Sequence, residues 1–451
     1  MKTSFVLGVD PGKTFFAASL FNSTGERIWK GRQFDMTREG IENLASILPE
    51  GDLTIGIEAS GRIDHNLTAW FGQWALACQR KRSVKIIRIN PGQSARFGGP
   101  KPRRDQTDGS DSQHIAEFTR VYALRLEQFN YDRKVQWLSR LVSERQRLVE
   151  DQTATKNRIH EQLLVCFPEF VQIFKDPFSK LAQAVLREVP TARCAARRQA
   201  LSLARVKAER KGASLGIEQA RQLIKLAERS IASAGEDHDG KALIFLLDEL
   251  DLIGSRLDSI KNAFANYVEE GKSQIGTDSD KGPSTARQIE LLDSMPGMAL
   301  ISASSMVLGT RGIGRFCSGK ALSAQWASCP ERVQTGTSLN KTKLTKRGDH
   351  KRRAMLYLNA QTACMHDPAF AFHRWRMIQK GLTPQQAVCA AMNRMARISW
   401  TLVAKNQLYD INHMIDQIKI HHADLWKTFV RLHQNDRKLW KKVEPKHRKI
   451  A

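Results

Sequence analysis

Four carboxylates lie in sequence contexts that could bring them together for chemistry on phosphodiesters. They are Asp10 in VLGVDPGKT, Glu58 in LTIGIEASG, and the pair Asp108 and Asp111 in QTDGSDSQHIAEF. Carboxylates that a fold crowds together repel one another, and they do not all stay ionised unless cations neutralise them. Two Mg²⁺ ions about 3.5–4 Å apart are the usual solution, one activating the attacking oxygen and the other stabilising the leaving oxygen. We therefore predict a two-magnesium phosphoryl-transfer site.

The first 128 residues predict the elements that must hold these carboxylates. Considered singly, each acidic residue also suits a turn, a strand end or a helix cap, so their joint placement carries the prediction. The order βββαβαβα is that of a ribonuclease-H-like mixed sheet, which brings its first strand, fourth strand and last helix to one edge. Asp10 is then on the first strand, Glu58 ends the fourth, and Asp108 and Asp111 share one face of the helix. Strands are expected at 5–10, 15–21, 27–34, 53–60 and 84–90, and helices at 37–48, 63–78 and 107–124.

Composition indicates a polyanionic partner. The chain has 71 Lys+Arg against 46 Asp+Glu and a formal charge of +25, which favours nucleic acid or an anionic membrane surface. No stretch approaches about 18 consecutive apolar residues and the N-terminus lacks a signal-peptide pattern, so we expect a cytosolic protein without membrane contact. The seven cysteines contain no C-x-x-C pair, which argues against structural zinc or disulfides.

Beyond the sheet domain the sequence predicts all-α regions, so the fold class is α/β plus all-α. Residues 129–273 read as a long helical coiled-coil arm, followed by a linker at 274–285, a mainly helical domain at 286–410 and a basic tail at 411–451. The arm could pair within one chain or form a dimerising spacer between chains. Aromatic residues of the tail could stack on bases or belong to a terminal helix. The seam of the coiled coil is predicted at Leu246, Leu250, Ile253, Leu257, Ile260, Phe264 and Tyr267.

Short motifs spread over residues 4–410 resemble those of the insertion sequence 110 family of bacterial transposases. The resemblance implies a RuvC-like domain whose acidic residues hold Mg²⁺, and a C-terminal transposase domain with a serine nucleophile. It also implies a structured bridge RNA that selects donor and target DNA, and a homodimer or homotetramer in the bacterial cytoplasm, associated with the nucleoid. The motifs are G-x-D at 8–10, I-E-A-S-G at 57–61, T-D-x-x-D at 107–111, FPEF at 167–170, MPGM at 295–298 and KRGDHKRRAML at 346–356.

The position that the resemblance assigns to the serine nucleophile holds a threonine. The family pattern is Pro, four residues, then Ser-Gly, whereas here Pro330 is followed five residues later by Thr335 and Gly336. A threonine hydroxyl can attack phosphorus, although its β-branched side chain restricts the rotamers from which it can approach. Three interpretations stay open: Thr335 is the nucleophile, Ser338 replaces it, or the chemistry is altered and strand exchange is lost.

A basic run from Asn340 to Arg353 follows this position. Its cations are predicted to hold the phosphates beside the scissile bond, with general nucleic-acid affinity as the alternative for each. The leading hypothesis is a DNA transposase that catalyses Mg²⁺-dependent cleavage and strand exchange. The alternatives are a RuvC-like junction-resolving endonuclease and a transposase-derived nucleic-acid-binding protein that has lost strand exchange. The predicted nucleic-acid-binding residues are Lys341, Lys343, Lys346, Arg347, Lys351, Arg352 and Arg353.

Overall fold

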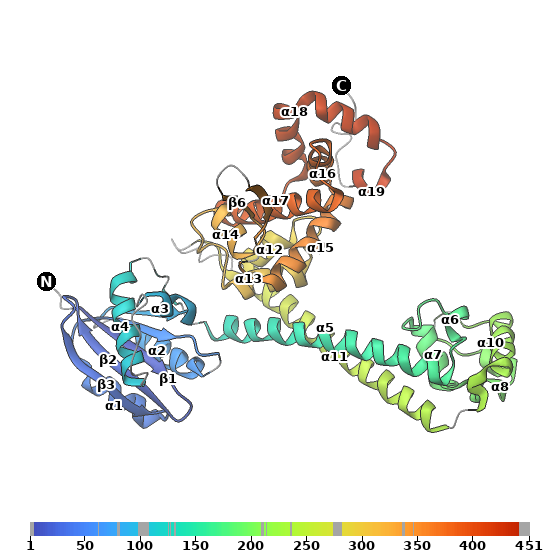
Figure 1. Ribbon diagram of the computed structural model, residues 1–451, viewed down its shortest axis with the longest axis horizontal. Helices are drawn as coiled ribbons and strands as arrows, with labels where there is room; N and C mark the ends of the chain where they lie inside the picture. The colour runs from blue at the N-terminus through green and yellow to red at the C-terminus, as the bar shows by residue number, and fades with distance from the viewer. Residues whose placement is uncertain are drawn as a thin grey trace. The chain divides into compact units, whose positions relative to one another are not determined.

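The computed structural model of the chain has two compact units, residues 1–137 and residues 138–451 (Figure 1). Most of the predicted linker at 274–285 lies outside the described residues. The structure describes residues 4–61, 63–78, 82–97, 108–124, 126, 128–129, 132–208, 212, 214–234, 237–273, 282–335, 339–345 and 347–441. For residues 96, 108, 233–234, 237, 273, 332–335, 339–342 and 437 it describes the backbone alone.

The first unit is built on a five-stranded mixed sheet. In the order β3-β2-β1-β4-β5, β2 is antiparallel to β1 and β3, whereas β4 is parallel to β1 and β5. This order and these directions are those expected of a ribonuclease-H-like sheet, so the predicted fold class of the N-terminal region is confirmed. The strands are β1 Ser4–Pro11, β2 Phe15–Asn22, β3 Arg27–Asp35, β4 Asp52–Glu58 and β5 Val84–Ile89.

The helices of this unit follow the prediction, with one addition. Thr37 caps α1 as expected, its hydroxyl accepting from Gly40 N at 3.1 Å. The short helix α3 was not predicted, because Pro91 was expected only to end β5. Proline also suits the first position of a helix, and Asn90 Oδ1 accepts from Gly92 N at 2.9 Å there. The helices are α1 Arg38–Ile47, α2 Asp64–Cys78, α3 Pro91–Phe97 and α4 Asp108–Tyr122.

Helix α4 lies very close to the sheet because side chains are missing at the contact. A Cβ on Gly8 of β1 would lie 2.3 Å from Ser112 O, and one on Gly31 of β3 would lie 2.4 Å from Gly109 Cα. Ser19 of β2 and Ser112 share a buried hydrogen bond of 2.9 Å. The first turns of α4 are therefore held tightly against three strands.

The second unit begins with a helical arm that pairs within the chain. Figure 1 shows the long helices α5 (Arg133–Cys166) and α11 (Asp237–Ser273) side by side. Arg158 of α5 donates to Glu249 of α11 at 2.9 Å, and Gln162 Nε2 donates to Asp239 O at 3.1 Å, so the two helices are antiparallel.

Only part of the predicted seam on α11 is buried. The buried residues are Leu250, Ile253, Ile260 and Phe264, together with Leu243, Leu247 and Val268, whereas Leu246, Leu257 and Tyr267 are only partly buried. A coiled-coil seam with two positions per heptad does not account for all of the buried face, because α11 packs against α5 and also contacts α7, α12 and α13. This packing buries a broad face of α11 within one chain.

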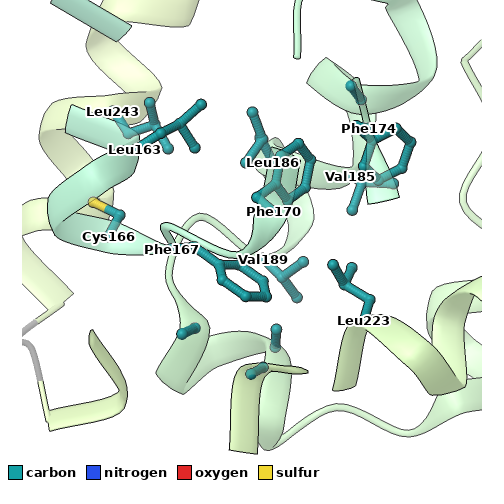
Figure 2. Close-up of a cluster of buried hydrophobic side chains, with 14 of the residues drawn as sticks. Leu163, Cys166, Phe167, Phe170, Phe174, Val185, Leu186, Val189, Leu223 and Leu243 are labelled. Carbon is teal, nitrogen blue, oxygen red and sulfur yellow. The ribbon is translucent and has the colours of Figure 1, made fainter. Parts of the chain in front are cut away.

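A small helical domain fills the interval between the two arm helices. Figure 2 shows its core, in which Phe167 and Phe170 lie among aliphatic side chains, and both are fully buried. Arg187 joins this domain to α11 through Asp248 and through Asp251, the latter at 2.7 Å. The FPEF motif is therefore a packing motif. The elements are α6 Phe170–Ile173, α7 Lys180–Glu188, α8 Ala192–Ala196, α9 Ala200–Ala204, α10 Ile217–Arg229 and the short 3₁₀ helix Ile231–Ala234.

The remainder of the second unit is mainly helical, as predicted, but it also contains a β-hairpin that was not predicted. The Pro-Gly turn after α12 packs on α15, since a Cβ on Gly297 would lie 2.3 Å from Asn359 O. The elements are α12 Thr285–Asp293, α13 Leu300–Thr310, α14 Gly319–Gln325, β6 Pro330–Thr335, β7 Leu339–Leu344, α15 His350–His366, α16 Pro368–Gln379, α17 Pro384–Lys405, α18 Ile411–His433 and α19 Arg437–Trp440.

The aromatic residues of the basic tail belong to a core. Trp426, Phe429 and Trp440 are 4%, 0% and 5% exposed, and the rings of Phe372 on α16 and Trp426 meet edge to face at 5.5 Å. These rings pack against one another and against α16, so they do not form an exposed surface on which nucleic-acid bases could stack.

His373 of α16 makes the stability of this region depend on acid. Burial, with Arg394 and Arg376 nearby, lowers the pKa of His373 to about 3. The folded pKa lies below the unfolded value of about 6.5, so stability is complete above that pH and is lost as the pH falls toward 3. We expect the free energy of unfolding to fall by roughly 1 kcal/mol per pH unit in this window.

Urea unfolding between pH 7 and pH 4 measures this dependence. In His373→Gln the free energy of unfolding should no longer show this dependence on pH. In His413→Gln, at an exposed position on α18, the dependence should remain. Equal slopes for the two variants would contradict the assignment to His373.

Candidate active site

Asp10 and Glu58 lie at the carboxyl ends of two neighbouring parallel strands. The pairing of β1 with β4 sets Val9 opposite Ile57, so the next residue of each strand is one of these carboxylates. Val9 and Ile57 are buried in the core that includes α2. Because side chains alternate along a strand, Asp10 and Glu58 face the opposite side, which α4 covers. The structure thus brings both residues to one end and one face of the sheet.

Helix α4 crosses the sheet just before these strand ends. Gly8 and Gly56 are paired neighbours, and each lies two residues before one of the carboxylates. A Cβ on Gly8 would meet Ser112 O at 2.3 Å, and one on Gly56 would meet Thr119 Oγ1 at 1.9 Å. The helix therefore runs from β1 to β4 at the level of the two glycines.

The N-terminal turn of α4 carries the other two predicted carboxylates. Asp108 is its first residue and Asp111 follows one turn later. Asp111 shares a helix face with Ile115, which belongs to the same buried cluster as Ile89, and Ile89 is paired with Glu58. Asp111 thus lies on the face of α4 that looks toward the end of β4, and for Asp108 the structure describes the backbone alone.

Glu58 is held by residues that the sequence analysis did not identify. Ser94 Oγ donates to Glu58 Oε1 at 2.8 Å and also lies 3.0 Å from Pro91 O, while its residue is only 3% exposed. His114 Nε2 lies 2.6 Å from Ser94 O, and the His114 ring lies 5.6 Å from the ring of Phe97. Helix α3 thereby links Glu58 to α4. The only sequence signals of this link are Asn-Pro with a serine three residues after the proline, and a histidine three residues after Asp111.

The donor atoms at this edge suit a hard divalent cation. Asp10, Glu58 and Asp111 offer carboxylate oxygens, which Mg²⁺ prefers, and the His114 Nε2 atom is engaged by a carbonyl. Among the side chains that the structure describes, no three histidine, cysteine or acidic groups are close enough together to hold a metal. The side chain of Asp108 is not among them.

Loss of the Ser94 hydroxyl should weaken metal binding without unfolding the domain. We expect Ser94→Ala to lower the affinity for Mg²⁺ by about 10–100-fold, since groups that orient a metal ligand typically have effects of this size. The cost in stability should be about 1 kcal/mol, the value of one hydrogen bond. Titration calorimetry with Mg²⁺ and thermal melts measure the two quantities, with Ser46→Ala on α1 as the control. Unchanged affinity in Ser94→Ala would show that Glu58 needs no support.

One candidate nucleophile, Thr335, belongs to the β6–β7 hairpin of the second unit. Thr335 is the last residue of β6 and pairs with Leu339, the first residue of β7. The structure describes the backbone of Thr335 alone, and Ser338 lies outside the described residues. The hairpin thus presents the threonine position at the end of a strand.

The predicted cations in and after the hairpin differ in their surroundings. Lys343 and Arg347 are exposed, whereas Lys346 and the side chain of Lys341 lie outside the described part of the chain. Arg352 is 18% exposed in its side chain, and burial lowers its pKa. Protein contacts occupy the other described cations: Lys351 Nζ to Glu150 Oε1 at 3.4 Å, Arg352 to Asp349, and Arg353 Nη1 to Thr345 O at 3.0 Å.

Two family models match the segments that carry these features. A model described as "Transposase", for the DEDD domain of the IS110 type, matches residues 7–168, which include all four carboxylates. A second model, described as "Transposase IS116/IS110/IS902 family", matches residues 289–374, which include the hairpin. The chain belongs to the IS110 family of transposases. None of the helices that the structure describes in this transposase is long and apolar enough to cross a membrane.

Individual relatives of this transposase are distant. It is 20% identical over 415 residues to the "Insertion element IS116 uncharacterized 44.8 kDa protein" of Streptomyces clavuligerus, covering 89% of this chain and 95% of that one. It is 26% identical over 130 residues to the "Pilin gene-inverting protein" of Moraxella bovis, covering 28% of this chain and 40% of that one. Among solved structures, RuvC of T. thermophilus in complex with a Holliday junction substrate matches with 14% identity and a TM-score of 0.21, covering 28% of this chain and 99% of that one.

Proposed function

We propose that this transposase cleaves and rejoins DNA when an insertion sequence moves. The observation that carries the proposal is the placement of Asp10 and Glu58 at adjacent strand ends, under the face of α4 that bears Asp111. Membership of a transposase family indicates the class of reaction, and the carboxylates indicate where on the protein we propose that it takes place.

The proposed cofactor is Mg²⁺, with two ions per site. Asp10, Glu58, Asp108 and Asp111 would hold it, and bound magnesium would neutralise the charge that develops on the phosphate during transfer. The protein's own part is to fix these oxygens. Ser94 restrains Glu58, and the close packing of α4 on the sheet restrains Asp111.

The proposed nucleophile is the hydroxyl of Thr335, with Ser338 as the alternative. An attack by this oxygen on phosphorus forms a threonine–phosphate ester and releases the deoxyribose hydroxyl, so the phosphodiester energy is kept for rejoining. The exposed Lys343 and Arg347, in and just after the hairpin, are suited to bind phosphates, because their charged side chains face solvent.

The remaining parts of the proposal concern assembly. Residues 1–128 would be the catalytic domain, 129–273 the arm, 286–410 the transposase domain and 411–451 a basic tail. The formal charge of +25 suits simultaneous binding of donor DNA, target DNA and a structured guide RNA. We further propose a homodimer or homotetramer that works in the cytoplasm, at the nucleoid.

An assay of strand exchange tests this function. The protein is purified from cells that carry its insertion sequence, bound RNA is sequenced, and the complex is mixed with donor and target DNA in Mg²⁺. We expect recombined junctions, an RNA from the element's own flanks, and DNA binding that weakens steeply as salt rises. Cleavage of branched DNA without junction products would instead favour a junction-resolving endonuclease. Binding without cleavage would favour a nucleic-acid-binding protein.

A further inference from the structure

A cavity of about 420 Å³ lies in the C-terminal part of the second unit, between α15, α16, α18 and α19. All of its lining residues come from these helices and the turn before α19, and none of them belongs to the sheet domain. Its lining includes Arg374, Lys438, His366, His433, Trp375 and Phe429. The cavity therefore combines cationic groups with aromatic walls.

Among its lining side chains the cavity has two basic groups, Arg374 and Lys438, against one carboxylate. Arg374 Nε is buried and has no hydrogen-bond partner among the described residues. Asp436 is the one carboxylate of the lining, and it caps α19 by accepting from the amides of Lys438 and Leu439 at 3.1 and 3.3 Å. Arg374 and Lys438 thus remain as donors for an anionic group, with His366 and His433 beside them.

The apolar part of the cavity suits a flat ring. Trp375 and Phe429 lie 5.8 Å apart between ring centroids, at an interplanar angle of 55°, and both line the cavity. Phe429 is fully buried, whereas Trp375 is only partly buried, so part of the indole remains accessible. A volume of about 420 Å³ is in the range of small-molecule sites and is too small for a duplex.

We propose that this cavity binds one unpaired nucleotide of a nucleic-acid strand. Arg374 and Lys438 hold its phosphate, and its base lies against Trp375, which is the combination of cation and aromatic ring by which proteins hold single strands. The site deepens the proposed function, because it gives the C-terminal helices a ligand. It rests on that function only in that the chain handles nucleic acid.

Binding of labelled oligonucleotides to the full-length protein tests the proposal. The probes are an octamer of uridine, an octamer of thymidine and a blunt duplex, followed by fluorescence anisotropy. We expect Arg374→Gln and Lys438→Gln to weaken binding of at least one octamer by about 5–20-fold, with duplex binding changed less than about 2-fold. The control is Lys427→Gln, which removes one charge from an exposed position of α18 and should change octamer binding less than about 2-fold. The two octamers separate RNA from DNA as the source of the nucleotide.

Two further measurements keep the outcome decisive. An octamer that carries 4-thiouridine should crosslink, on irradiation, to a peptide that contains Trp375. Lys438 is exposed, so Lys438→Gln answers the question even where Arg374→Gln fails to fold. The proposal is overturned if Arg374→Gln and Lys438→Gln bind the octamers as tightly as Lys427→Gln does. It is also overturned if the crosslinks are confined to peptides that lack Trp375. Either result leaves the proposed function intact if strand exchange persists. Unimpaired cleavage by an Asp10 variant would overturn the proposed function, but it would not bear on nucleotide binding in the cavity.

Discussion

Replacing Asp10 with asparagine lowers the rate of DNA cleavage in Mg²⁺ by roughly 10³-fold. The amide keeps the shape of the side chain but loses the charge that attracts a divalent cation, at the strand end where Glu58 adds a second charge. The loss should be in the chemical step, since the proposed phosphate-binding cations lie elsewhere in the chain. Single-turnover cleavage of a labelled donor measures the rate, and anisotropy measures the affinity for DNA.

The matched control for this substitution is Asp35→Asn. Asp35 ends β3, the edge strand that β2 separates from β1, and is exposed, so the same charge is removed from the same sheet outside the proposed site. Cleavage by this variant should stay within about 2-fold of the parent, as is usual for exposed surface positions. Full cleavage by Asp10→Asn would remove this residue from the metal site and, with it, the main support for the proposed reaction.

Replacing Thr335 with alanine abolishes strand exchange and the covalent link between protein and DNA, while DNA binding is retained. Alanine has no hydroxyl to attack phosphorus, so no phosphate ester can form. Thr335→Ser should preserve or raise the rate, because serine keeps the oxygen and removes the methyl group that restricts χ1. Adducts that survive denaturing gels report the ester, and junction products report exchange.

Ser338→Ala separates the two candidate hydroxyls. Loss of adducts in this variant, together with full exchange by Thr335→Ala, would assign the attack to Ser338. Adducts that persist in both variants would mean that a third protein group attacks the phosphorus. Cleavage that depends on Asp10 but gives no adduct even in the parent protein would mean that water is the nucleophile and that the chain hydrolyses DNA.

The sheet and its helices could be predicted because their signals are local. Alternating or continuous apolar runs give β1 to β5, and Thr37 marks the start of α1. Helix α3 was missed because Pro91 suits both the end of a strand and the start of a helix. The β6–β7 hairpin was missed because its strands are short and polar, with no apolar alternation against which to set a register.

The site could be predicted only in part, for a related reason. The neighbouring positions of Asp10 and Glu58 could be predicted because parallel strands end at the same edge of a sheet. The support from Ser94 and His114 depends on how α3 docks against α4, which no spacing in the sequence encodes. For the aromatic residues of the tail the sequence left two alternatives open, because Trp426 among lysines suits either a base-stacking surface or a terminal helix, and the structure buries it in a helical core.

The glycines beneath α4 set the dimensions of the acidic site. Gly8 and Gly56 leave no room for even one methyl group, at 2.3 Å from the helix backbone and 1.9 Å from a threonine oxygen. Alanine at Gly8 would have to raise the helix by about 1 Å to reach ordinary contact, and a misplacement of that size can cost about 10²-fold in rate. The lack of a side chain at Gly8 and Gly56 thus sets the spacing between Asp10 and Asp111. Substitution of a glycine, which has no reactive group, would therefore change the rate of the reaction.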